Sequence, residues 1–385
     1  MTVLRSTVVD VDLDAIAHNL AVMGQRGQRV IAVVKADAYG HGAEVVSRTL
    51  VEAGAEMLAV FTVEEGIVLR RSGIGAPVLV LGGITDPSEA DAAVAHGLAV
   101  VVWDEERARL LAAAAAAQRV TPRVHVKVDT GLTRLGAPLA TALERYRAIR
   151  RLLGPSIDGM FTHFANADEP GDTFTAEQMR RFEELLVALP ERPRLVHASA
   201  SAAAVALDTS ATCNAVRPGL ALYGLHAAPH LGSVSLRPAL RWTSRVHRVA
   251  PAPRGTGVSY GHDYRLPRDG HIATVPVGYG DGLPRAAARR ARLLVRGRAV
   301  PIAGRVCMDL IMLDVTDVAG VSEGDEVVLI GEQDGVRSSA EDLAAACGTI
   351  NYETVTNLRP RVPRRYLRSG HIVATRTLAD GVVWS

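Results

Sequence analysis

Lysine is almost absent from this sequence. Of 385 residues only Lys35 and Lys127 are lysines, whereas 41 are arginines. Either residue type can supply a surface charge or a salt bridge, but only a primary amine can lose its proton and add to a carbonyl carbon. The two remaining lysines therefore indicate chemistry at their positions. The alternative is that both are chance survivors of a compositional drift toward arginine.

Cysteine is also scarce, and neither sign of charge is in excess. The three cysteines, Cys213, Cys307 and Cys347, are odd in number and widely spaced, which fits neither a disulfide framework nor a metal-binding knuckle. The formal net charge is only +2, and the arginine-rich runs near 285–298 and 359–368 are short. We therefore expect no metal ion, no nucleic acid partner and a reducing cytoplasmic location.

Long apolar runs are missing as well. No uninterrupted apolar stretch could span a bilayer, and the N-terminus "MTVLRSTVVDVD" lacks the apolar core of a signal peptide. A membrane is therefore not an expected partner. The chain is too long for one ordinary core, so we expect one large domain and a smaller one.

Short apolar runs alternate with stretches of helical length in the first part of the chain. The expected strands are "VIAVV" (30–34), "MLAVF" (57–61), "VLVL" (78–81), "AVVVW" (99–103), "VHVKV" (124–128), "GMFTHF" (159–164), "LVHAS" (195–199) and "GLALYG" (219–224). The expected helices are 12–26, 86–96, 104–118, 138–152 and 175–189. This alternation predicts a parallel (β/α)₈ barrel over residues 10–236, an α/β fold whose active sites lie at the C-terminal ends of the strands.

Both lysines fall near strand ends of the predicted barrel. Lys35 directly follows the first strand, and Lys127 lies near the end of the fifth. The period of two puts His125, Lys127 and Asp129 on one face of that strand, opposite three valines. We expect this polar face to point into the barrel.

The pattern changes beyond about residue 237. Short alternating strands with Gly and Pro turns, such as "HIATVPVGYG" and "DEVVLIG", predict a mostly antiparallel β domain over 237–385, and we expect residues 1–9 to join it. One helix is expected near 339–347, with a serine at its start and a glycine at its end.

Eight segments of this chain carry a resemblance to a known family. They are "VVKADAYGHG", "KVDTGLTRLG", "FTHFANAD", "VRPGLALYG", "GVSYGH", "GYGDGLPR", "GRVCMD" and "INYETV". In this order, across both predicted domains, they are similar to the motifs of the alanine racemases, and eight ordered matches make accident very improbable. The resemblance implies pyridoxal 5'-phosphate bound as a Schiff base on Lys35. It also implies a homodimer in which each β domain supplies residues to the partner subunit's active site.

The residues around Lys35 suit such a cofactor. Gly40 and Gly42 let backbone approach a ligand, and the segment "RPGL" offers the backbone amides of Gly219 and Leu220 to a phosphate at an expected helical turn. By resemblance the side chains of three further residues help to hold the phosphate: Tyr39, Ser201 and Tyr352. Without the family, both tyrosines would be interpreted as half-buried packing residues.

Arg217 matches the family arginine that faces the pyridine nitrogen of the cofactor. A guanidinium stays protonated, so it can donate a hydrogen bond but does not easily give the nitrogen a full proton. The ring is then a weaker electron sink, which suits an enzyme that only moves one proton. The alternative interpretation is a structural arginine before a Pro-Gly turn.

Racemisation needs two bases, one on each face of the substrate carbon. The resemblance assigns Lys35 to one face and Tyr260 of the partner subunit to the other. An ordinary phenol is a poor base at neutral pH, so cationic or hydrogen-bonding neighbours must favour its phenolate, and His163 and Arg217 are the expected helpers. Judged alone, His163 would be a satisfied core histidine and Tyr260 a loop aromatic.

The substrate carboxylate needs a fork-shaped donor. Arg134 in "TRLG" is the candidate, helped by the backbone amide of Met308 from the other subunit. In the family the lysine at the position of Lys127 is often carbamylated, and the resulting anion orients that arginine; the alternative is an ordinary ion pair between Lys127 and Asp129. The residues that resemble the substrate entryway, where bulk would favour a small amino acid, are Asp168, Tyr279, Arg285, Arg305 and Ile350.

One position departs from the family pattern. The chain reads "HASAS", with Ala200 where the family usually has asparagine before the serine, so a side-chain hydrogen bond near the phosphate or Tyr39 is expected to be missing.

The sequence thus predicts a racemase that interconverts L-alanine and D-alanine, with three alternatives. They are a racemase of serine or another small amino acid, an amino acid decarboxylase, and a non-catalytic cofactor-binding relative. Retention of both candidate bases argues for catalysis.

Overall fold

The structure, a computed structural model, describes residues 3–232 and 234–385. The chain forms two compact units. The barrel unit comprises Ala15–Tyr39 and Val46–Arg237, and the β unit comprises Met1–Asp14, Gly40–Val45 and Pro238–Ser385.

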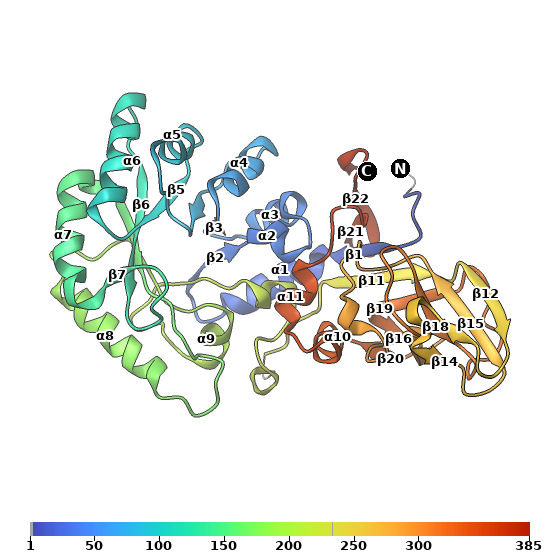
Figure 1. Ribbon diagram of the computed structural model, residues 1–385. Coiled ribbons are helices and arrows are strands. Elements are labelled where there is room, and N and C mark those ends of the chain that lie inside the picture. Colours follow the sequence, from blue (N-terminus) through green and yellow to red (C-terminus); the bar gives the residue numbers. More distant parts are fainter. Residues whose placement is uncertain (1–2, 233) are drawn as a thin grey trace. The chain divides into compact units, whose positions relative to one another are not determined.

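The barrel unit contains a closed parallel barrel, as predicted. Eight strands follow one another around it, and the ring is completed because β5 pairs with β6 and β10 pairs with β2. Helices α4 to α8 lie outside the strands (Figure 1). The barrel strands are β2 (Arg29–Val33), β3 (Met57–Val60), β4 (Val78–Val80), β5 (Ala99–Val102), β6 (Arg123–Asp129), β8 (Ile157–Phe161), β9 (Leu195–His197) and β10 (Ala215–Val216). The short strand β7 (Ala137–Pro138) pairs with the end of β6.

The eighth strand is not where the sequence predicts it. The apolar run 219–224 forms a 3-10 turn, η3 (Leu220–Tyr223), which ends at Gly224 with a φ of 77°. The strand itself is the shorter β10, just before this run. A short apolar run cannot be assigned to strand or helix from periodicity alone, because both bury all of its side chains.

Three helices of the barrel unit, α4, α5 and α6, begin at side-chain caps that elementary capping rules explain. Thr62 and Glu65 form a reciprocal capping box, and Asp86 and Asp104 accept hydrogen bonds from amides in the first turns of their helices. The helices are α1 (Leu13–Met23), α2 (Lys35–Tyr39), α3 (Ala43–Glu52), α4 (Val63–Arg71), α5 (Pro87–Ala95), α6 (Glu105–Gln118), α7 (Ala142–Leu153), α8 (Phe174–Ala188) and α9 (Ser201–Ala206).

The β unit is built on three sheets. The largest has the order β17-β16-β19-β11-β1-β21-β22-β23, with β20 paired to β19, and the others are β12-β15-β18 and β13-β14. All of its pairings are antiparallel except that of β1 with β21. The strands are β1 (Val8–Asp12), β11 (Leu240–Arg245), β12 (Arg248–Ala252), β13 (Gly257–Val258), β14 (Tyr264–Arg265), β15 (Gly270–Val275), β16 (Arg292–Val295), β17 (Arg298–Pro301), β18 (Ile311–Asp314), β19 (Glu326–Gln333), β20 (Val336–Ser338), β21 (Arg364–Arg368), β22 (His371–Thr377) and β23 (Gly381–Trp384).

The β unit also holds the predicted helix near 339–347. Helix α10 (Ala340–Cys347) begins at a capping box between Ser339 and Asp342 and ends at Gly348, whose φ is 71°. A second helix, α11 (Asn351–Thr356), follows after three residues. No helix within residues 3–232 and 234–385 is long and apolar enough to cross a membrane.

Candidate active site

The segment after β2 has an unusual backbone. Lys35 is followed by four consecutive non-glycine residues with positive φ, from 51° at Ala36 to 54° at Tyr39. A left-handed turn costs about 1–2 kcal/mol per L-residue, so the surroundings must hold it. Two bonds do so: the Ala38 amide donates to the Val34 carbonyl at 2.9 Å, and the Ala36 amide donates to a carboxylate oxygen of Glu65 at 2.6 Å.

The left-handed turn carries Tyr39 onto the segment after β10. A Cβ on Gly219 would lie 2.4 Å from the Tyr39 hydroxyl oxygen, so only glycine lets the phenol approach this closely. Ser201 Oγ accepts hydrogen bonds from the amides of Gly219 and Ala221 at 3.0 and 3.1 Å. Backbone amides and hydroxyls therefore meet beside the turn η3, a donor set that suits an anion.

Ala200 stands at the N-cap of the short helix α9, and no side chain caps this helix. Asparagine is among the best N-cap residues, because its side-chain oxygen accepts from an amide of the first turn. An asparagine at position 200 could therefore cap the helix that begins with Ser201, whereas Ala200 cannot.

Arg217 is buried at the C-terminal end of β10, and its exposed fraction is 3%. One terminal nitrogen, Nη1, donates to Nδ1 of His197 at 2.6 Å, and the other, Nη2, donates to Nδ1 of His163 at 3.0 Å and to the Thr162 carbonyl at 3.2 Å. The guanidinium carbon lies 4.7 Å from the centre of the Phe161 ring. The guanidinium is thus fixed by hydrogen bonds at both terminal nitrogens and by the Phe161 ring against one face of its plane.

Four basic side chains near the C-terminal ends of the barrel strands interact electrostatically: Lys35, Lys127, Arg134 and Arg217. Burial lowers the pKa of Lys35, and Arg134 and Arg217 lower it further. Burial, followed by the charges of Arg217 and Arg134, lowers the pKa of Lys127 to about 8. Both shifts favour the neutral amine, which is the form that acts as a nucleophile or base.

His163 is the neutral member of this group. Burial is the largest cause that holds its pKa well below the ordinary value, and the charge of Arg217 is the next. Because its Nδ1 accepts a hydrogen bond from Arg217, the proton of the neutral ring lies on Nε2.

Asp129 holds the loop that carries Arg134. One of its oxygens accepts from the amides of Gly131 and Thr133 at 2.9 and 3.1 Å. Among the residues that the structure describes, no ion pair joins Asp129 to Lys127. Lys127 is 6% exposed, and its Nζ lies 5.6 Å from the centre of the Phe161 ring. The side chain of Arg134 is exposed.

In the β unit the structure brings Tyr260 and Met308 to one hollow of about 490 Å³. Its lining consists of Ser259, Tyr260, Gly261, His262, Cys307, Met308, Asp309 and Leu310. Tyr260 is 71% exposed, an unusual degree for an aromatic residue, and Met308 is 51% exposed. Tyr260 follows Ser259, whose φ is 65° and whose hydroxyl donates to the Arg305 carbonyl at 2.8 Å, so the loop is fixed although its tyrosine is not covered.

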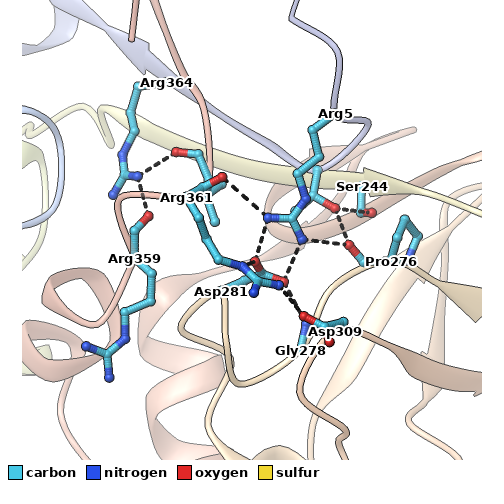
Figure 2. A network of polar contacts seen from close by, with 11 residues as sticks. Arg5, Ser244, Pro276, Gly278, Asp281, Asp309, Arg359, Arg361 and Arg364 are labelled. Atoms are coloured by element: carbon cyan, nitrogen blue, oxygen red, sulfur yellow. Dashed lines mark hydrogen bonds and ion pairs between the residues drawn. The ribbon is translucent and has the colours of Figure 1, made fainter. Parts of the chain in front are cut away.

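A buried carboxylate fixes the neighbouring loops of the β unit (Figure 2). Asp281 is fully buried and accepts from Arg5 at 2.6 and 2.8 Å, from Arg361 at 2.7 Å and from the Gly278 amide at 2.9 Å. Arg361 also reaches Asp309, beside Met308, at 2.5 Å. Burial alone would raise the pKa of Asp281, but the hydrogen bonds from the two arginines lower it.

Backbone bonds continue this connection toward Met308. The amides of Tyr279 and Gly280 donate to the carbonyls of Cys307 and Met308 at 3.0 and 2.9 Å. The loop after β15 and the loop before β18 are therefore joined as one unit, and Asp281 fixes both.

The remaining predicted residues lie apart from these clusters or carry fewer described contacts. In the β unit, Arg305 forms an ion pair with Asp263 at 2.6 Å, Arg285 begins a 3-10 turn, Ile350 is 62% exposed and Tyr352 lies in α11. In the barrel unit, Asp168 lies half-buried in the turn after β8.

Sequence reasoning missed several residues of the site. Glu65 accepts a hydrogen bond from the amide of Ala36, next to Lys35, whereas Phe161 and His197 contact the Arg217 guanidinium. Asp281 accepts from the Gly278 amide in the loop that bonds to Met308. A weak signal existed for two of them, because a histidine in "LVHAS" and an aspartate in "GYGDG" are polar residues in otherwise apolar or glycine-rich runs. Nothing in the sequence indicates that Glu65 reaches the Ala36 amide.

Two family models match this chain. The model of the alanine racemase N-terminal domain matches residues 11–227, and that of the C-terminal domain matches residues 239–366. Alanine racemases from Halothermothrix orenii and Symbiobacterium thermophilum are 42% and 43% identical to the chain. Each comparison covers 94% of this chain and 97% of the relative.

Solved structures are similar over almost the whole chain. The alanine racemase from Bacillus anthracis with bound L-Ala-P has a TM-score of 0.90 at 35% identity and covers 98% of this chain and 99% of its own. The alanine racemase of Clostridium difficile 630 in complex with cycloserine has a TM-score of 0.89 at 31% identity, with coverage of 98% and 99%.

Proposed function

Because this chain belongs to the alanine racemase family, we propose that it is an isomerase that interconverts L-alanine and D-alanine with pyridoxal 5'-phosphate as its cofactor. The observation that carries the proposal is the arrangement around Lys35. A half-buried amine with a lowered pKa, a buried guanidinium and a set of amides and hydroxyls occur together at the C-terminal ends of the barrel strands.

The residues present fit this cofactor. The hydroxyl of Tyr39, which lies close to Gly219, and the hydroxyl of Ser201 would donate to a phosphate, together with the amide of Leu220. Arg217 would face the pyridine nitrogen, Lys35 would bond to the aldehyde carbon, and the resemblance adds Tyr352 to the phosphate site. When bound, the cofactor withdraws electrons from the substrate Cα, which makes its proton removable.

Two bases then move the proton. Lys35 takes or returns it on one face of the substrate carbon, since burial and two neighbouring cations favour its neutral amine. Tyr260 of the partner subunit serves the other face. The 71% exposure of Tyr260 within a fixed loop supports this assignment, because a phenol that serves another subunit must be uncovered in its own chain.

Arg217 and His163 have complementary roles. Four acceptors hold the Arg217 guanidinium, and it would donate to the pyridine nitrogen without transferring a proton. His163 stays neutral with its proton on Nε2, which it can donate to a phenolate oxygen and so favour the basic form of the tyrosine.

Arg134 and Met308 bind the substrate carboxylate in this proposal. Lys127 is carbamylated, and its new negative charge orients Arg134. Two observations support the carbamate: the lowered pKa of Lys127 provides the neutral amine that adds to carbon dioxide, and the surrounding cations Arg217, Arg134 and Lys35 would stabilise an anion. The predicted entryway residues Asp168, Tyr279, Arg285, Arg305 and Ile350 would then limit the substrate to a small amino acid.

The activity is tested by a racemisation screen over alanine, serine and other small amino acids, with the products separated on a chiral column. We expect alanine to be inverted in both directions, and a Lys35→Ala variant to be inactive. Release of carbon dioxide without inversion would indicate a decarboxylase instead. Cofactor binding without turnover of any amino acid would indicate a non-catalytic relative.

A further inference from the structure

A row of buried polar side chains leads from Arg217 to the opposite end of the barrel. Nδ1 of His197 lies 2.6 Å from Arg217, Nε2 of His197 lies 2.9 Å from Nδ1 of His125, and Nε2 of His125 lies 3.9 Å from an oxygen of Asp158. Both histidines are fully buried. Asp158 stands at the start of β8, whereas Arg217 follows the end of β10, so the row runs along the barrel interior.

The position of every proton in this row is determined by its neighbour. Arg217 can only donate, so Nδ1 of His197 is the acceptor and the proton of a neutral His197 lies on Nε2. That proton points at Nδ1 of His125, which must accept, and the proton of His125 then lies on Nε2. This N–H has no hydrogen-bond acceptor among the described residues, and the nearest charged oxygen is that of Asp158.

The barrel makes room for the row. A Cβ on Gly159, which pairs with His125 across the strands, would lie 2.4 Å from Nδ1 of His125. Phe161, two residues later, stacks on the His197 ring at 4.7 Å between centres and 8° between planes. Any side chain at position 159 would displace His125, so the glycine and the stacked ring together define one orientation of both histidines.

Burial keeps His125 neutral, because the negative charge of Asp158 at the far end is compensated. Asp158 accepts from Arg123 at 2.8 Å and from Arg194 at 2.7 and 3.0 Å, so two guanidinium groups compensate its charge. Burial is the main cause that lowers the pKa of His125 to about 3, and Asp158 opposes it while Arg123, Arg194 and Arg217 add to it. A neutral His125 is required, because a protonated Nδ1 would face the N–H of His197.

We propose that His125 is a positioning residue for Arg217. Its Nδ1 accepts a hydrogen bond from the Nε2–H of His197, and this bond fixes the His197 tautomer whose Nδ1 accepts from the guanidinium. The inference rests on the proposed function where it concerns catalysis, but the proton positions do not depend on it. Without an acceptor at position 125, His197 can adopt the other tautomer. The Nδ1–H of His197 would then face an N–H of Arg217, and the repulsion between the two donors would displace the guanidinium.

The first test is independent of activity. Nitrogen-15 NMR of histidine-labelled wild-type protein without cofactor distinguishes protonated from unprotonated ring nitrogens, and the signals are assigned with single histidine variants. We expect both His125 and His197 to be neutral with the proton on Nε2. A proton on Nδ1 of either ring, or a cationic His125, would overturn the proposal whatever reaction the protein catalyses.

The second test compares three variants of the cofactor-loaded enzyme. His125→Leu removes the acceptor, His125→Asn restores an oxygen close to the position of Nδ1, and Gln28→Leu is the matched control. Gln28 is a buried amide of the same unit, 8% exposed, that bonds to Thr209 and Cys213 and not to the row. Melting temperature, the visible absorbance of the bound cofactor, kcat and KM are measured for each.

We expect His125→Leu to shift the absorbance maximum and to lower kcat by roughly tenfold with little change in KM, since a misplaced Arg217 affects the reacting state more than substrate binding. His125→Asn should recover most of both properties, and Gln28→Leu should lower only the melting temperature. If His125→Leu behaves like Gln28→Leu, the residue is merely structural and the proposal is wrong. If the wild type itself binds no pyridoxal phosphate, the proposed function fails, and the NMR result still decides on the proton positions.

Discussion

The two lysines are the residues on which the chemistry depends, and their environments differ. Lys35 begins a strained left-handed turn, whereas Lys127 lies within a strand beside three cations. We predict that borohydride reduction of the cofactor-loaded protein fixes the cofactor to Lys35 alone. Peptide mass spectrometry of the reduced protein identifies the modified lysine. An adduct on Lys127 would reverse the roles assigned to the two residues.

Carbamylation of Lys127 is predicted to depend on pH. The pKa of its ammonium is about 8, so the neutral amine, and with it the carbamate, should increase as the pH rises through that value at a fixed carbon dioxide concentration. Carbon-13 NMR with labelled carbon dioxide should show one carbamate signal, absent from Lys127→Ala.

Replacement of Lys127 should also affect the substrate site. In Lys127→Ala we expect a weaker affinity for alanine and a lower activity, because Arg134 loses its anionic neighbour, and added acetate or chloride should restore part of the activity. Lys127→Arg keeps the positive charge but cannot form the adduct. Full activity of Lys127→Arg would contradict the carbamate.

At the scale of single elements, the sequence predicted most of the barrel because its first seven strands overlap short apolar runs that stretches of helical length separate. The prediction of the eighth strand was wrong because β10 has only two residues, and the more apolar run after it forms a turn. The ordered family motifs indicated the candidate catalytic and binding residues. The contacts of Glu65, His197 and Asp281, however, join segments that are distant in the sequence. Such contacts follow from the packing of distant segments, which local periodicity does not encode.

Helix α9 offers a simple gain in stability. Ala200→Asn should supply the absent N-cap and stabilise the protein by about 0.5–2 kcal/mol. If the cap also orders Ser201, the affinity for pyridoxal phosphate should increase. Urea unfolding without cofactor measures the first effect, and a cofactor titration measures the second. No gain in stability would mean that the asparagine side chain cannot reach the first turn of α9.

The loops around Met308 depend on Asp281. Asp281→Asn should lower stability by about 1–3 kcal/mol, because the half-buried Arg5 and Arg361 lose their charged hydrogen-bond partner. Asp309→Asn, at an exposed member of the same network, should cost about 1 kcal/mol or less. Since the folded pKa of Asp281 is depressed, its contribution is present at neutral pH and is lost as the pH falls through the folded value. The difference in unfolding free energy between wild type and Asp281→Asn should therefore shrink in acid, and an unchanged difference would contradict the assignment.

At the scale of the whole molecule, the candidate residues divide between the two units of the chain. Lys35, Arg134, His163 and Arg217 belong to the barrel unit, whereas Tyr260 and Met308 share a hollow of the β unit. The proposed reaction needs members of both sets at one substrate carbon. In the proposed homodimer each active site combines one subunit's barrel unit with its partner's β unit, so a pair of subunits is the smallest active assembly.

Mixing two inactive variants tests this central claim most directly. Lys35→Ala and Tyr260→Phe should each be nearly inactive, because each lacks one of the two bases. After subunit exchange, a mixed dimer has one site with both substitutions and one site with neither. Random reassortment makes half of the dimers mixed, so activity should recover to roughly a quarter of wild type if the sites act independently. If native mass spectrometry demonstrates exchange and no activity returns, Lys35 and Tyr260 do not meet across subunits as the two bases.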